Sequence, residues 1–214
     1  MKDTDVIWDF NGTIIDDVET GIKSVNTMLA ERGLDTIPDK DTYRKIFHFP
    51  IEDYYRELGF DFEREPYEVL APIWVALYLE NAKTAPLQPY VREAIELFGA
   101  KGLSQHVLSA SELSMLKEQL GDFGLLDKFE SISGLDNIHA RSKSELARAW
   151  REAHPNATSL VIGDTEHDAE TASLLGADCA LICGGHQTKE KLLECEGAHV
   201  YDSLIDLCKT LFEE

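Results

Sequence analysis

Polar side chains that could do chemistry stand at or just after the ends of short apolar segments. Asp9 is the penultimate residue of "TDVIWDF", Ser109 ends "SQHVLS" and Asp164 follows "TSLVIG". Lys143 opens a helical stretch, and Asp168 lies four residues after Asp164, about one helical turn on. Two carboxylates that converge from separate strands are hard oxygen ligands suited to Mg²⁺. A nearby lysine and hydroxyl would supply the charge and the donor that hold a phosphoryl group.

Each of these residues has an ordinary structural explanation when it is taken alone. Asp164 in "GD" could cap a helix or shape a turn, and Ser109 before "ASE" could cap the helix that follows. Lys143 could be a solvated surface lysine. The functional interpretation depends on the ordered set, because all of its members are predicted at one edge of one sheet.

Short apolar runs alternate with helical patterns over most of the chain. Strands are predicted at 4–10, 104–109, 129–133, 158–163, 179–183 and 198–201. Helices are predicted near 89–101, 111–121, 141–153, 166–175, 187–194 and 202–212. This alternation predicts an α/β fold with a Rossmann-like, mostly parallel sheet covered on both faces. Active sites in such sheets lie beyond the carboxyl ends of the strands.

The stretch 17–84 interrupts the alternation. Its apolar residues recur at helical spacing without a convincing strand, and Gly33 and Gly59 each follow a helical pattern as C-cap residues would. We therefore predict a helical domain at 17–84, inserted into a core domain made of residues 1–16 and 85–214.

Composition excludes some partners and leaves others open. The formal net charge of −20 over 214 residues argues against nucleic acid and against an anionic membrane surface. The longest apolar run, 69–79, is too short to span a bilayer and contains Pro72. The four cysteines form no C-x-x-C pair and the first residues do not resemble a signal peptide, so a cytoplasmic protein with reduced thiols is expected. Oligomeric state is left open.

The ordered motifs resemble those of the haloacid dehalogenase-like hydrolase superfamily. The first family motif, D-x-D-G-T, is similar to "DFNGT" except at its third residue. The second, a Ser or Thr at a strand end, matches Ser109 in "VLSAS", and the third, a lysine, matches Lys143 in "RSKSE". The fourth, G-D-x-x-x-D, matches "GDTEHD", and the helical insert occupies the position of the family's cap domain. The resemblance is closest to the phosphoglycolate phosphatase and β-phosphoglucomutase branch, which has a helical (C1-type) cap.

The resemblance implies a role for each matched residue. Asp9 would be the nucleophile that forms an aspartyl-phosphate. Mg²⁺ would be held by Asp9, Asp164 and the backbone carbonyl of Asn11. Lys143 would pair with the nucleophile and the phosphate, and Ser109 would donate to a phosphoryl oxygen.

The same resemblance implies the surroundings of the phosphate. Backbone N–H groups around Gly12 and Ala110 would complete an anion cradle, with Thr13 shaping the phosphate-binding turn. Asp168 would not bind the metal directly but would orient its water shell. The cap would close over a small phosphorylated metabolite and select its leaving group.

Asn11 departs from the family pattern. In the family's phosphatases the carboxyl at this position acts as general acid and then as general base, and an amide can do neither. Such proton transfer typically contributes about 10²–10⁴-fold in rate, roughly 3–5 kcal/mol. The backbone carbonyl that would bind the metal is unaffected. The sequence therefore supports binding and phosphorylation more strongly than turnover.

Three interpretations of Asn11 remain open at this stage. The protein could be a phosphatase with good leaving groups or with another proton carrier, for which His48 and His167 are candidates, although each has a structural explanation. It could be a phosphonate hydrolase that uses a cap lysine, Lys40 or Lys45, to form a Schiff base. It could also be a catalytically weakened protein that binds phosphate and Mg²⁺.

Overall fold

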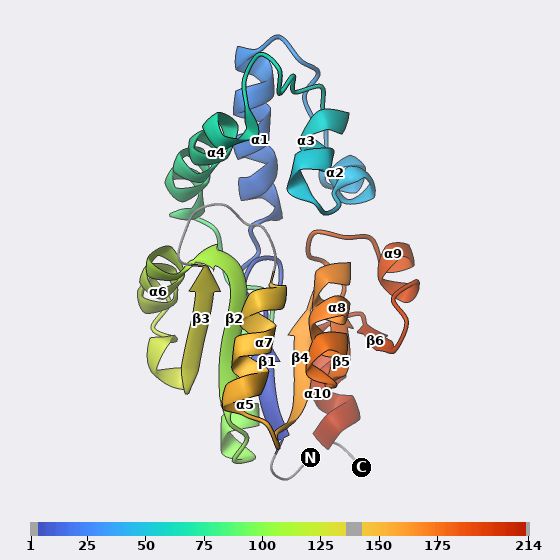
Figure 1. Ribbon diagram of the computed structural model, residues 1–214. Helices are drawn as coiled ribbons and strands as arrows, with labels where there is room; N and C mark the ends of the chain where they lie inside the picture. The colour runs from blue at the N-terminus through green and yellow to red at the C-terminus, as the bar shows by residue number, and fades with distance from the viewer. Residues whose placement is uncertain (1–3, 136–142, 213–214) are drawn as a thin grey trace.

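The computed structural model describes residues 4–135 and 143–212, and within them one parallel sheet forms the centre of the molecule (Figure 1). Its strands are β1 (Thr4–Trp8), β2 (Gln105–Glu112), β3 (Ser131–Leu135), β4 (Thr158–Gly163), β5 (Asp178–Ile182) and β6 (Ala198–Tyr201). The strand order is β3-β2-β1-β4-β5-β6. The predicted α/β class with a Rossmann-like sheet is confirmed. Strand order reverses between β1 and β4, the point where such sheets form their binding crevice.

Helices cover both faces of this sheet, and side chains of β1 alternate between them. The helices are α5 (Val91–Ala100), α6 (Leu113–Asp122), α7 (Ser144–Ala153), α8 (Glu166–Leu175), α9 (Lys189–Leu193) and α10 (Leu204–Phe212). Val6 and Trp8 pack in one core cluster with α5, α6 and α10. Ile7 packs in another with α7, α8 and α9. This period of two is the direct consequence of the strand pleat, and both faces are apolar because both are covered.

The inserted stretch forms a separate helical layer. It contains α1 (Val18–Glu31), α2 (Lys40–Ile46), α3 (Ile51–Glu57) and α4 (Tyr67–Ala82), which share their own apolar cluster. Figure 1 shows these helices beyond the arrowheads of β2 and β3, so they stand over the carboxyl end of the sheet. Gly33 and Gly59 follow α1 and α3 with φ of 67° and 95°, a conformation that favours glycine after a helix. The domain boundaries at 16/17 and 84/85 stay a prediction.

Several predicted element ends differ from the structure by one to three residues. β2 runs on to Glu112, because it pairs with β3 again after an irregularity between Leu108 and Glu112. Ser109 therefore lies inside β2 rather than ending it, and α6 begins at Leu113 rather than at 111. β3 lies two residues later than predicted. Residues 141 and 142 of the predicted helix 141–153 lie outside the described residues.

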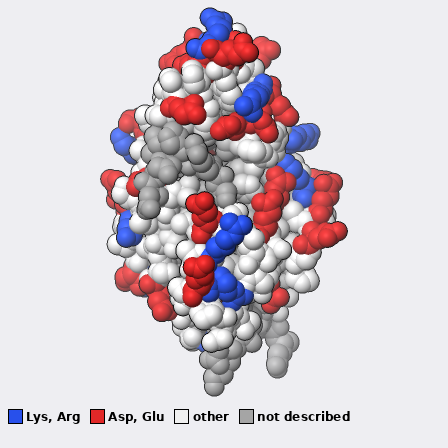
Figure 2. All heavy atoms as spheres, in the orientation of Figure 1, with Lys and Arg blue, Asp and Glu red and all other residues white. Residues whose placement is uncertain are grey.

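The surface carries mixed charge. On the face drawn in Figure 2, acidic side chains are scattered from the cap end to the opposite end, and basic side chains lie among them without forming one basic surface. Among the described residues, none of the helices has the length and apolar character needed to cross a membrane.

Candidate active site

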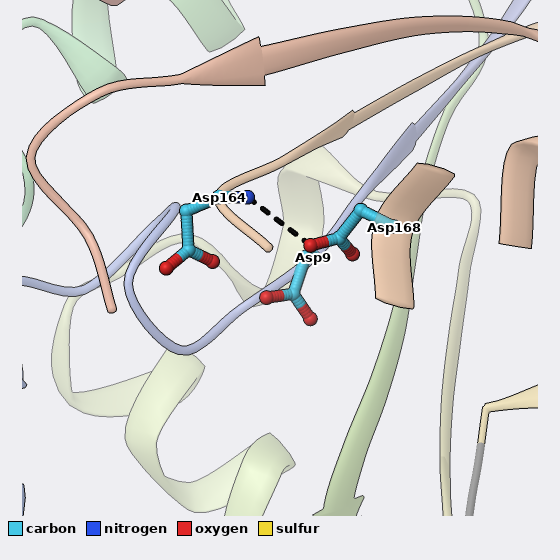
Figure 3. A group of neighbouring side chains, drawn as sticks. All are labelled: Asp9, Asp164 and Asp168. Carbon is cyan, nitrogen blue, oxygen red and sulfur yellow. Dashed lines mark hydrogen bonds between the residues drawn. The ribbon is translucent and has the colours of Figure 1, made fainter. Parts of the chain in front are cut away.

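Three buried aspartates meet at the carboxyl edge of β1 and β4. Asp9 directly follows β1, Asp164 directly follows β4, and Asp168 lies in the first turn of α8 (Figure 3). One carboxylate oxygen of each lies within 4.8 Å of one carboxylate oxygen of the other two. Asp168 Oδ2 accepts from the backbone N–H of Asp164 at 3.1 Å and of Thr165 at 3.0 Å, which fixes the turn between β4 and α8. Strand topology thus brings together carboxylates that are 155 residues apart (164 minus 9).

Lys143 supplies a cation to two of these carboxylates. Its ammonium donates to Asp9 and, at 2.8 Å, to Asp168 Oδ1. Burial opposes the charge on Lys143, but Asp168 and Asp9 outweigh it and raise the pKa of the ammonium. Burial raises the pKa of Asp9 well above its usual value, with Lys143 acting in the opposite direction. Burial also raises the pKa of Asp164 to about 6.

These carboxylates fit a divalent cation. Burial and neighbouring carboxylates raise the pKa of Asp9 and of Asp164, so a cation beside them would stabilise their ionised forms. Carboxylate oxygens are also the ligands that Mg²⁺ prefers. Asp168 is less available, because Lys143 occupies Oδ1 and Oδ2 accepts from both backbone N–H groups and from the Thr165 hydroxyl. The donor set therefore fits the predicted pair, Asp9 and Asp164, better than the full trio.

The turn after β1 is closely packed against Asp164. Gly12 has φ of 74°, and a Cβ there would lie 2.2 Å from Asp164 Oδ2, so only glycine fits. The Thr13 hydroxyl donates to Asp164 Oδ1 at 3.1 Å. Neither residue is among the described residues that line the cavity beside the aspartates. Thr13 is thus placed behind a carboxylate, where it holds the turn, and its predicted contact with phosphate stays a prediction.

The amide of Asn11 is held on every side by the protein. Its Nδ2 donates to Asp17 Oδ2 and to the Tyr78 hydroxyl, each at 2.8 Å. Its Oδ1 accepts from the Ser111 hydroxyl at 2.7 Å. Tyr78 comes from α4 of the cap and also donates to Asp17 Oδ2 at 2.9 Å. Through its hydrogen bonds to Asp17 and to Tyr78, Asn11 therefore links the turn after β1 to α4 of the cap.

Asp17 is a fourth buried carboxylate at this edge. Its Oδ1 accepts from the backbone N–H of Gly12 at 2.8 Å and lies 3.2 Å from His186 Nε2. Burial opposes its ionisation, but His186 and hydrogen bonds from His186, Asn11 and Tyr78 lower its pKa. Asp17 is thus an ionised carboxylate beside the Asn11 amide.

His186 ties the loop after β5 to both the core and the cap. Its backbone N–H donates to Asp164 Oδ2 at 2.6 Å, and its Nδ1 lies 2.7 Å from the Tyr43 hydroxyl of α2. Burial lowers the pKa of the imidazole, but Asp17 outweighs this and raises the pKa to about 9. The side chain is therefore a buried imidazolium at neutral pH.

The metal-free protein is expected to lose stability as pH rises from 6.5 to about 9. A His186 pKa that folding raises from 6.5 to about 9 favours the protonated folded state. Its contribution is complete below pH 6.5 and is lost as pH rises through 9, on the order of 3 kcal/mol in total. Urea unfolding at pH 6.5 and 9 with EDTA measures the loss. A His186→Gln variant that retains the full loss would contradict the assignment.

A cavity of about 180 Å³ opens between these residues and the cap. Asp9, Asn11, Ser109, Ala110 and Lys143 all line it. Ser109 is buried, and its Oγ accepts from the backbone N–H of Ser111 at 3.0 Å. The predicted nucleophile, hydroxyl and lysine thus face one space that a small ligand could enter.

The alternative proton carriers and lysines are placed differently. His48 Nε2 lies 3.2 Å from Glu57, and His48 is not among the described residues that line the cavity. His167 does line it and stacks on Phe49 with ring centroids 3.6 Å apart, and burial lowers its pKa. The Lys40 ammonium lies 3.6 Å from Glu19, and neither Lys40 nor Lys45 is among the described lining residues.

The haloacid dehalogenase-like hydrolase family model matches residues 6–182. The chain belongs to the haloacid dehalogenase-like hydrolase family. The match begins in β1 and ends with β5, so it includes both strands that carry the aspartates, the helical insert and the lysine between them. As a family member, the protein is a hydrolase.

Relatives of this hydrolase are distant in sequence and close in fold. It is 22% identical to a phosphoglycolate phosphatase of Pseudomonas syringae pv. tomato, over 93% of this chain and 76% of that protein. It is 24% identical to "Probable phosphatase IndB" of Dickeya dadantii, over 94% of this chain and 90% of that protein. A haloacid dehalogenase-like family protein of Streptococcus pneumoniae superposes with a TM-score of 0.81 at 19% identity, over 97% and 98% of the two chains.

Sequence reasoning missed three contributors to this hydrolase site. Asp17 could have been sought from "DD" directly before a predicted helical stretch. His186 lies in "GGHQ" after a strand, a place where a site residue could have been sought. Tyr78 lies in an apolar helix and carried no distinguishing pattern.

Proposed function

We propose that the protein is a Mg²⁺-dependent phosphohydrolase, similar to phosphoglycolate phosphatase, that acts on a small organic phosphate through an aspartyl-phosphate on Asp9. The observation that carries the proposal is the ion pair of Asp9 with Lys143, buried beside Asp164 and open to the cavity under the cap. The phosphatase names of the curated relatives support the same class. The four cysteines are free, which supports a cytoplasmic setting.

Each residue of the site would have a distinct role in the reaction. An Asp9 oxygen attacks phosphorus while Lys143 neutralises charge beside it, and Ser109 with the N–H of Ala110 binds phosphoryl oxygens. Asp9, Asp164 and the carbonyl of Asn11 would hold Mg²⁺. When bound, Mg²⁺ offsets the repulsion between the carboxylate and the phosphate dianion. Water then releases phosphate from Asp9 and restores the carboxylate.

Asn11 affects the two steps of this reaction, formation of the aspartyl-phosphate and its hydrolysis, in different ways. Its Nδ2 and Oδ1 are already bound to Asp17, Tyr78 and Ser111, so the amide holds the site together without exchanging a proton. Leaving groups that depart as anions do not need the missing acid. Slow release of phosphate from Asp9 would give the catalytically weakened alternative, a protein that binds and becomes phosphorylated. The phosphonate hydrolase alternative receives no support from Lys40 or Lys45.

Removal of Mg²⁺ tests the proposal directly. Hydrolysis of a panel of phosphate monoesters should depend on added Mg²⁺ and disappear with EDTA, and Mg²⁺ should raise the melting temperature by relieving repulsion between Asp9 and Asp164. Mass spectrometry after acid quenching should find phosphate on the peptide that contains Asp9. Phosphorylation without product would favour the weakened alternative. Equal activity in EDTA would contradict the proposal.

A further inference from the structure

The wall of the active-site cavity that the cap contributes is aromatic and aliphatic. It includes Phe47, Phe49, Ile51, Tyr54, Trp74 and Val75. The cavity of about 180 Å³ exceeds the roughly 150 Å³ of an engineered apolar cavity that binds benzene. The cavity is therefore larger than the space that a single aromatic ring requires.

The described lining residues offer little positive charge to a second anionic group. Lys143 and His186 line the cavity, but Asp9 and Asp168 already bind Lys143, and Asp17 already pairs with His186. Asp17 and Glu112 also line the cavity, and both are negative. A substrate with a carboxylate beyond its phosphate would meet these carboxylates without a free cation among the described lining residues.

A nearby cap cation is already occupied elsewhere. Arg44 of α2 donates to the backbone carbonyls of Gly185 at 2.8 Å and Gly184 at 2.7 Å, and it does not line the cavity. Its guanidinium fixes the cap on the loop after β5. The charge pattern thus favours an uncharged leaving group.

Trp74 contributes an aromatic surface to the cavity that Asp9 and Asn11 also line. Its ring stacks on that of Tyr78, with centroids 4.9 Å apart and planes 19° apart. The Tyr78 hydroxyl is bound to Asn11 and Asp17, so the ring pair is anchored beside the position of the missing acid. A ring on the leaving group can pack against Trp74 while its oxygen remains near Asn11.

We propose that the substrate is the phosphate monoester of a small, uncharged phenol. This inference rests on the phosphohydrolase proposed above and names its substrate class. The Asp9 oxygen forms a bond to phosphorus as the bond from phosphorus to the aryl oxygen breaks, and the electron pair leaves with the phenolate. Water protonates the released phenolate and leaves hydroxide. A second water then attacks phosphorus as the bond from phosphorus to the Asp9 oxygen breaks, and the proton that this water loses neutralises the hydroxide, so that inorganic phosphate and the free Asp9 carboxylate result.

The chemistry of a phenol agrees with an amide at position 11. A phenolic hydroxyl has a pKa of about 10, against about 15.7 for water, which an aliphatic alcohol approaches. A phenolate can therefore depart unprotonated at neutral pH, whereas an alkoxide needs an acid. The aromatic wall and the lost acid are two independent features that favour the same substrate class.

Steady-state kinetics on three esters with Mg²⁺ test the inference. Phenyl phosphate should exceed phosphoglycolate in kcat/KM by at least about tenfold. Benzyl phosphate, which keeps the ring but has an alkoxide leaving group, should show a kcat/KM at least about tenfold lower, because kcat/KM reports the phosphorylation step in which the leaving group departs. Calorimetry should show tighter binding of phenylphosphonate than of phosphonoacetate, which gives a readout that does not require turnover.

Trp74 variants with a matched control complete the test. Trp74→Ala should raise KM for phenyl phosphate about tenfold with little change in kcat, Trp74→Phe should restore it, and Trp74→Lys should shift preference toward phosphoglycolate. Val69→Ala, an exposed position on the same helix, should change nothing. Mg²⁺-dependent hydrolysis that prefers phosphoglycolate would overturn the substrate class and leave the phosphohydrolase intact. Failure to bind or cleave any of these compounds would overturn both.

Discussion

Asp9→Asn is expected to reduce turnover of an activated aryl phosphate on the order of 10⁴-fold or more. An amide is too weak a nucleophile to form the phosphoryl bond, and members of a nucleophilic catalytic set act over this range in other hydrolases. The fold should survive. Burial raises the pKa of Asp9, so a neutral group there relieves repulsion with Asp164, and Lys143 keeps Asp168 as its partner.

The measurement pairs kcat with thermal unfolding for Asp9→Asn and for Asp178→Asn. Asp178 is exposed at the first residue of β5, at the opposite end of the sheet, and provides a matched change of carboxylate to amide. The control should keep full activity, and Asp9→Asn should keep its melting temperature while losing activity and the phosphorylated peptide. Parental activity in Asp9→Asn would show that another group is the nucleophile.

The parts of the site that follow strand ends could be predicted because topology fixes them. Asp9 and Asp164 each follow a buried apolar strand, and the two strands are parallel neighbours. Both residues must therefore lie at the carboxyl edge of the sheet, independently of how other side chains pack. Lys143 needed more than topology, since a lysine that opens a helix has no pattern of its own. Its position was available only from the order of the family's motifs, and its catalytic role stays a prediction.

The contacts around Asn11 could not be predicted in the same way. Asn11 meets Tyr78 67 residues away, and Asp17 meets His186 169 residues away. These contacts depend on how the cap and the loop after β5 pack against the core. The hydrophobic periodicity of a single helix or strand carries no information about that packing. The substitution of Asn11 was visible in the sequence, but its partner Asp17 was not.

Asn11→Asp alone is expected to destabilise the protein by on the order of 3 kcal/mol. The Asn11 amide donates to Asp17 Oδ2 at 2.8 Å, and a carboxyl there would set two buried carboxylates against each other. One of the two would be driven to hold a proton. The single substitution should therefore raise turnover far less than a restored general acid would.

The double substitution Asn11→Asp with Asp17→Asn is expected to recover stability and to raise turnover of benzyl phosphate about 10²–10⁴-fold, the usual contribution of general acid–base catalysis. The amide at 17 can donate to the carboxyl at 11, and its oxygen can still accept from Gly12 and His186. The Tyr78 hydroxyl, which donates to Asp17 Oδ2 at 2.9 Å in the parent, can donate to the carboxyl at position 11 instead. The exchange thus keeps one carboxylate at this pair of positions and moves it from position 17 to position 11, beside the leaving group.

A double-mutant cycle in urea, with kcat measured for each member, tests this exchange. The coupling energy between positions 11 and 17 should be at least about 2 kcal/mol, because Asn11→Asp alone sets two buried carboxylates against each other and the double substitution does not. Additive effects would mean that the hydrogen bond seen between Asn11 and Asp17 is not what holds the amide. A stable double variant without a gain on benzyl phosphate would mean that leaving-group protonation does not limit the rate. Phenyl phosphate should gain less than benzyl phosphate in the same variant, since only the alkoxide needs the acid that the exchange supplies.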